Sequence, residues 1–210
     1  MFLRLVSEPT VLVIAAIVMV MALIFHNIVQ ALVAERLGDR SPRLAGFAAF
    51  EPQRQLDPFG VLFLLLLGFG WPRAVPVNPR NYRGRGRGEA WVWLAGIGSY
   101  LAVAFVSLLV AAVFRSLGSS VLYFSFEVAA NYALLHAVIN LVPILPLDMG
   151  RAALAWGHPD VRRVIMQVAQ FGILGFMVFF FVLNATGVIG RVMFFFDRLF
   201  SDIIGLIPGL

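Results

Sequence analysis

Apolar and polar residues follow one another along this chain in blocks long enough to cross a lipid bilayer. Uninterrupted apolar sequence begins at Val11 and, through a mildly polar turn after Phe25, continues to about residue 34. A helix needs about 20 apolar residues to span the hydrocarbon core of a membrane. The sequence therefore predicts spanning helices over residues 11–34, 91–114, 121–142 and 164–183, and a Phe-rich membrane or interfacial helix over residues 188–208.

The sequence between the first two spans does not fit an upright helix. Residues 58–71 are apolar but too few for a span, so they predict a re-entrant or strongly tilted segment. Before them, residues 44–50 lie between turn signals and predict a small irregular or β segment at the membrane surface. The stretch 71–89 is rich in proline, glycine and arginine, and it is not expected to be helical. The predicted fold is an all-α polytopic membrane protein with one integral domain over residues 1–210.

Composition and charge support a membrane protein. The chain is 61% hydrophobic and 13% charged, whereas soluble domains are about 45–50% apolar. The net charge of +5 comes from loop arginines, which indicates membrane topology and not nucleic-acid binding. We expect a multi-pass protein of the cell inner membrane, with the N-terminus outside and the loops at 78–89 and 148–163 in the cytoplasm. Four arginines of the first loop are candidates for binding anionic lipid headgroups: Arg80, Arg83, Arg85 and Arg87.

Polar residues inside the predicted spans mark the candidate chemistry. The first span ends in "FHNIVQALVAERLGD", which places His26 and Gln30 one helical turn apart and Asn27 beside the histidine. The third span carries His136 and ends in "NLVPILPLDMGR", where two prolines break the helix before Asp148. Polar and ionisable groups are rare inside membranes and are often functional. With no cysteine in the chain, a metal site would need histidine, carboxylate or amide ligands.

The order of these motifs resembles the site-2 protease family of intramembrane zinc metalloproteases, especially its compact prokaryotic branch. The resemblance runs through "AERLGD", "LDPFG", "GFGWPRAVPVNPRNYR" and "NLVPILPLD" to "TGVIG" near the C-terminus. It implies a helical bundle in which a His-Glu-x-x-His motif on the first span supplies two zinc ligands and the general base. A later aspartate supplies the third ligand, and a Gly-Pro-x-x-Asn motif lines the cleft.

This chain departs from that pattern at the positions that carry the chemistry. His26 and Asp148 stand at the first-histidine and aspartate positions, but Asn27 replaces the glutamate and Gln30 replaces the second histidine. The cleft motif reads "GIGSY", without its proline or asparagine. The resemblance implies cleft positions at Gly96, Ser99, Tyr100, Asn140, Pro143 and Pro146.

These replacements remove the expected chemistry. Asn27 cannot act as a general base, because a carboxamide does not exchange protons near neutral pH. Gln30 offers only a neutral amide oxygen, which is a poor ligand for zinc. A catalytic zinc site uses three protein ligands, so we expect no catalytic residue and no bound cofactor. His136 lies about three helical turns before Asp148 and could complete a triad with His26, although a buried histidine more often satisfies a neighbouring helix.

Three functions are compatible with this sequence. The first is a catalytically inactive protease-like protein that acts as a scaffold or accessory subunit of a larger membrane complex, with other integral membrane subunits and lipids as partners and no nucleic acid. Its old site would then hold a structural cluster in which His26, Asn27 and Gln30 hydrogen-bond to Asp148, while Tyr100 either fills the cleft or faces lipid. The second is an active zinc metalloprotease with a non-standard ligand set. The third is a lipid or small-molecule carrier that uses the vacated cleft.

Overall fold

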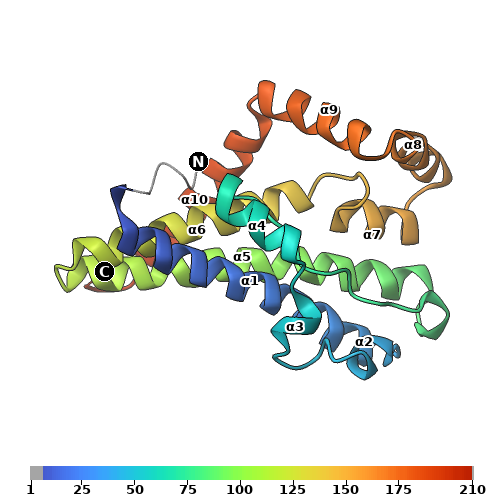
Figure 1. Ribbon diagram of the computed structural model, residues 1–210, viewed down its shortest axis with the longest axis horizontal. Coiled ribbons are helices and arrows are strands. Elements are labelled where there is room, and N and C mark those ends of the chain that lie inside the picture. Colours follow the sequence, from blue (N-terminus) through green and yellow to red (C-terminus); the bar gives the residue numbers. More distant parts are fainter. Residues whose placement is uncertain (1–6, 210) are drawn as a thin grey trace.

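A bundle of three long helices forms the centre of the computed structural model, which describes residues 7–209 without the side chains of Ile173, Phe176 and Met177. The three helices are α1 (Pro9–Arg36), α5 (Gly86–Ser116) and α6 (Ser120–Asn140), and they lie side by side (Figure 1). In the described part, these three are long and apolar enough to cross a membrane as single helices. The fold is therefore all-α and polytopic, as predicted, while residues 1–6 and 210 of the predicted domain lie outside the described part.

Small side chains bring the three helices close together. The core between them contains six buried alanines, along with Met19, Leu23 and Tyr100: Ala15, Ala22, Ala104, Ala129, Ala133 and Ala137. In a membrane, small residues allow helix backbones to approach and gain van der Waals contacts. The close packing holds α1 and α5 in a fixed relation, and both helices contribute residues to the site described below.

The chain between α1 and α5 forms short helices and an extended return. It contains α2 (Ser41–Leu44), α3 (Pro52–Gln55), α4 (Pro58–Leu67) and the 3-10 helix η2 (Pro79–Asn81). Within residues 7–209 no strand forms at the predicted irregular or β segment, and one isolated antiparallel bridge joins Leu56 to Pro72. The backbone N–H of Arg73 also donates to the Gln55 carbonyl at 2.7 Å. The chain thus turns back after α4 and passes beside α3.

Four helices follow α6: α7 (Asp148–Trp156), α8 (Pro159–Ala169), α9 (Gly172–Ala185) and α10 (Val188–Ile204). The predicted span over residues 164–183 is not continuous, because the chain turns between α8 and α9, where Gly172 has a left-handed φ of 55°. Residues 178–185 and 188–204 instead form a pair bent by 63° that can serve as one span. α10 replaces the predicted helix over 188–208, ends at Ile204 and packs on α5 and α6.

Candidate functional site

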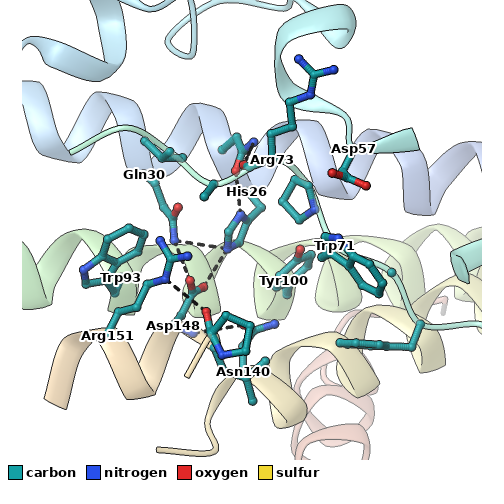
Figure 2. A pocket seen from close by; sticks show the side chains of 18 residues that line it. His26, Gln30, Asp57, Trp71, Arg73, Trp93, Tyr100, Asn140, Asp148 and Arg151 are labelled. Atoms are coloured by element: carbon teal, nitrogen blue, oxygen red, sulfur yellow. Dashed lines mark hydrogen bonds and ion pairs between the residues drawn. The ribbon is translucent and has the colours of Figure 1, made fainter. Parts of the chain in front are cut away.

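A cavity of about 380 Å³ lies at the meeting point of α1, α5, the start of α7 and the extended segment after α4 (Figure 2). α1 contributes His26, Asn27 and Gln30 to its lining, and the extended segment contributes residues 69–75. The first turn of α7 places Asp148 opposite α1. Residues that are far apart in the sequence are therefore brought together where the resemblance places its cleft.

Asp148 is held by two side chains from α1. The Nε2 of His26 lies 2.7 Å from Asp148 Oδ2, and Gln30 Nε2 donates to Asp148 Oδ1 at 3.1 Å. Gln30 Nε2 is also 3.2 Å from His26 Nε2, and His26 Nδ1 lies 3.2 Å from the side-chain oxygen of Asn27. Figure 2 shows these contacts converging between α1 and α7. His26, Gln30 and Asp148, which we call the polar cluster, are all buried.

Gly96 on α5 closes the third side of the polar cluster. A Cβ atom at this position would lie 2.6 Å from His26 Nε2 and 2.7 Å from Asp148 Oδ2, and it would clash with Gln30 Nε2. Real Cβ atoms do not make contacts this short. The glycine of the predicted cleft motif is therefore required for the present arrangement of the cluster.

Asn27 does not contact Asp148, contrary to our expectation of a shared cluster. Its Nδ2 donates to the Arg73 carbonyl at 3.0 Å and to the Gln55 carbonyl at 3.3 Å. These bonds fasten α1 to the extended segment and to the end of α3. The residue at the general-base position of the family motif thus acts as a hydrogen-bond donor to two backbone carbonyls, a task that a carboxylate cannot perform.

His136 is committed to backbone contacts. Its Nδ1 lies 2.7 Å from the Tyr132 carbonyl, and its Nε2 accepts the backbone N–H of Gly70 at 3.2 Å. Within residues 7–209, no group of three or more His, Cys, Asp or Glu side chains could hold a metal ion. The structure therefore does not assemble the alternative triad of His26, His136 and Asp148.

Tyr100 lines the cavity and does not face lipid. It is 1% exposed, and its ring stacks on that of His26 with centroids 4.7 Å apart. His136 lies on another side of it at 5.4 Å, and Phe69 continues the aromatic contacts beyond His136 at 5.0 Å. The side chain at the position where the resemblance implies an asparagine is therefore buried beside the polar cluster.

The other predicted cleft residues have separate positions. Ser99 donates to the Gly96 carbonyl of its own helix at 2.6 Å. Asn140 lines the cavity and joins α6 to α7, since its Nδ2 donates to the His136 carbonyl at 2.9 Å and its Oδ1 accepts from Asp148 N at 3.3 Å. Pro146 lines the cavity, whereas Pro143 does not.

Arg151 is a cavity residue that sequence analysis did not identify. Its Nε donates to the Pro146 carbonyl at 3.1 Å, and its guanidinium lies over the Trp93 ring at 4.7 Å. Burial lowers the pKa of Arg151, while the negative charges of Asp148 and Glu89 act in the opposite direction. The spacing of three residues from Asp148 on a short helix was the available signal, because such residues share a helix face.

The arginine-rich loop lies outside the cavity. All four predicted headgroup ligands are exposed, and Arg87 lies 5.1 Å from the ring of Trp156. The segment is also more ordered than its composition predicts: residues 79–81 form η2, and α5 begins at Gly86, inside the stretch that was not expected to be helical. Their exposure leaves these arginines accessible to a negatively charged surface.

The donor set of the polar cluster does not fit a catalytic zinc ion. It offers one imidazole and one carboxylate, and Gln30 presents its NH₂ group to both of them. An amide NH₂ group donates hydrogen bonds and has no ligand lone pair. Zinc enzymes use three protein ligands and an open position, so no zinc-dependent step follows from these residues.

Comparison with known proteins finds a relative that covers most of the chain. A Bacillus subtilis protein named "Putative zinc metalloprotease YwhC" is 30% identical to this chain over 173 residues, which cover 78% of this chain and 78% of that protein. No family model and no solved structure matches the chain.

Proposed function

Because this chain belongs to the same protein family as the zinc metalloprotease-like YwhC, we propose that it is a non-proteolytic member of that family. In this proposal it acts as a scaffold or accessory subunit among other integral membrane proteins. The family relationship agrees with the resemblance to site-2 proteases. The proposal explains why the family frame persists around positions that have lost their chemistry.

The observation that carries the proposal is the closed polar cluster. The two remaining ligand positions, His26 and Asp148, contact each other at 2.7 Å, and Gln30 hydrogen-bonds to the second carboxylate oxygen. A buried carboxylate is costly unless it is paired and hydrogen-bonded, and this one is satisfied by protein groups alone. The cluster thereby joins α1 to α7, which is a structural role.

The commitment of Asn27 supports the same conclusion. A general base must be within hydrogen-bond reach of the water or substrate proton that it removes. Asn27 instead points its NH₂ group at the carbonyls of residues 55 and 73. Loss of the base together with gain of a structural contact is what we expect of a site that has been converted to hold the fold.

The outer surface supports a scaffold role in a membrane. α4 exposes Phe59, Leu62 and Leu67, and α10 exposes Phe194 and Phe195. Such side chains can contact lipid or other membrane helices. We place the protein in the inner membrane with the arginine-rich loop on the cytoplasmic side, where anionic lipids would attract its exposed arginines.

The alternative, an active zinc metalloprotease with non-standard ligands, is favoured by the name of YwhC alone. The two proposals differ in metal content. The test is to purify the full chain in mild detergent without chelator and to measure zinc per chain by elemental mass spectrometry, for the natural protein, for Asp148→Ala and for His158→Ala. His158 is an exposed histidine that does not line the cavity, and it serves as the control.

We expect zinc far below one ion per chain in all three proteins. Near-stoichiometric zinc that disappears in Asp148→Ala but not in His158→Ala would overturn the proposal and support the active protease. The scaffold role is tested separately by crosslinking in native membranes, where stable membrane-protein neighbours are expected. A chain that crosslinks to no other membrane protein would contradict the accessory-subunit role.

A further inference from the structure

A second cavity lies where α5 ends, α6 begins and α10 ends. In Figure 1 the end of α5 and the start of α6 lie at the end of the bundle away from α7. Its volume is about 640 Å³, within the range of small-molecule sites. It shares no lining residue with the cavity that contains the polar cluster. Its chemistry is therefore independent of the proposed function.

Charges of both signs face this cavity without neutralising each other. Arg115 stands at the end of α5 and Glu127 on the second turn of α6, and both line the cavity. Among residues 7–209, neither of them takes part in a salt bridge. The carboxylate of Glu127 accepts the Tyr123 hydroxyl at 2.9 Å, and the Arg115 guanidinium lies 5.9 Å from the Tyr123 ring.

A further negative charge lies nearby on α10. Asp197 acts electrostatically on the Tyr123 hydroxyl and is half-buried. Within residues 7–209, the cavity therefore combines a cation that is outside any salt bridge with a carboxylate that accepts the Tyr123 hydroxyl, and a second carboxylate lies close by. A ligand that matches this pattern carries an anionic group and a separate ammonium group.

The rest of the wall is mixed: Ser116 and Ser201 add hydroxyl groups, and an apolar strip runs along α5. Leu108, Ala111 and Ala112 lie along one face of α5 below Arg115, and Ile204 closes the wall from α10. Residues at spacings of three and four share one helix face, so this strip leads from the charged end of α5 into its apolar span. A headgroup at the charged end would place an acyl chain along the strip.

We propose that this cavity binds a phospholipid with a phosphoethanolamine headgroup. The phosphate is paired with Arg115, and the primary ammonium donates hydrogen bonds to Glu127. A charge-assisted hydrogen bond of this kind favours a primary ammonium over choline, which has no N–H to donate. An anionic phosphatidylglycerol headgroup would place no positive charge against the carboxylate.

The test is lipid titration of the purified full chain in detergent, followed by native mass spectrometry. The probes are dioleoyl-phosphatidylethanolamine, dioleoyl-phosphatidylglycerol and dioleoyl-phosphatidylcholine. We expect the natural protein to bind phosphatidylethanolamine about fivefold more tightly than the other two, the effect of one partly exposed ion pair. Glu127→Gln removes this preference and leaves phosphatidylglycerol binding unchanged or stronger. Arg115→Gln weakens all three lipids by about fivefold.

Two controls keep the result interpretable. Arg198→Gln changes an exposed arginine of α10 that does not line the cavity, and it is expected to bind as the natural protein does. Ala112→Phe narrows the apolar strip and keeps every charge, so it is expected to lower binding of all three lipids. Circular dichroism and thermal unfolding identify a variant that fails to fold. If a charge variant fails to fold, lipid binding by Ala112→Phe tests the cavity in its place.

Three results would overturn the proposal. The first is equal affinity of the natural protein for the three lipids, and the second is unchanged selectivity in Glu127→Gln. The third concerns the source of the headgroup: if soluble glycerophosphoethanolamine binds as tightly as the lipid, then the ligand is a soluble phosphoethanolamine compound and the acyl part of the proposal is wrong.

Discussion

Two buried carboxylates, Asp39 and Asp148, are held in different ways. Asp39, just after α1, accepts backbone N–H groups from Asn78 at 2.7 Å and Ser41 at 3.0 Å, together with the Asn81 side-chain amide at 2.9 Å. Asp148 is held mainly by side chains from α1, His26 and Gln30. The contacts of Asp39 therefore depend mainly on the paths of two loops. The contacts of Asp148 depend on which side chains stand at two positions of α1.

This difference separates a contact between two loops from the polar cluster. Two of the three Asp39 donors are backbone N–H groups, which are present whatever the side chain, so the Asp39 contacts show mainly that the loops at 39–41 and 78–81 are joined. The Asp148 contacts require specific residues at the positions where the resemblance to site-2 proteases implies zinc ligands. If the polar cluster holds the fold together, single substitutions in it should lower the free energy of unfolding.

The largest expected effect is that of Gly96→Val. The new side chain would collide with all three members of the polar cluster and force the buried His26–Asp148 contact apart, at a cost of about 4 kcal/mol of unfolding free energy. Denaturation of the purified protein in detergent measures the loss. Gly98→Val is the matched control, since a Cβ there has no neighbour within 4 Å. Equal losses for both variants would mean that α5 helicity, and not the cluster, sets the cost.

The next effect is that of Asp148→Ala, with an expected loss of about 3 kcal/mol, because removing one partner of a buried pair leaves the other unsatisfied. Asp160→Ala, which removes an exposed carboxylate from α8, is expected to change stability very little. The comparison is made by thermal unfolding in the same detergent. If Asp148→Ala were as stable as the natural protein, the cluster would have no structural role.

A smaller loss of about 2 kcal/mol is expected for Asn27→Asp, which keeps the shape of the side chain but loses the donors to residues 55 and 73. Faster hydrogen exchange in residues 69–75 would accompany it. Asn131→Asp is the control, since the Asn131 amide donates only to a backbone carbonyl of its own helix and is exposed. If exchange in residues 69–75 does not change, Asn27 does not hold the extended segment.

Much of this architecture can be predicted from the sequence, for identifiable reasons. Long apolar runs fix the three spans, and helical spacing together with the proline break brings His26 and Gln30 towards Asp148. The partners of Asn27 could not be predicted, because they are backbone carbonyls whose positions depend on how the chain returns after α4. The break before Gly172 was not predicted, because residues 164–183 are mostly apolar on both sides of the turn.

The smallest expected effect is the pH dependence of the stability that Asp39 contributes. Burial alone would raise the pKa of Asp39, but hydrogen bonds from Asn78, Ser41 and Asn81 outweigh burial and hold this pKa below its usual value. A carboxyl group whose pKa is lower in the folded state stabilises the fold above its unfolded pKa, and this contribution is lost as the pH falls through the folded pKa. Asp39→Asn should therefore lower stability by about 1 kcal/mol at pH 7 and by less near pH 3. Thermal unfolding at both pH values measures this change, and an equal loss at the two would show that the contact between the two loops does not depend on the charge of Asp39.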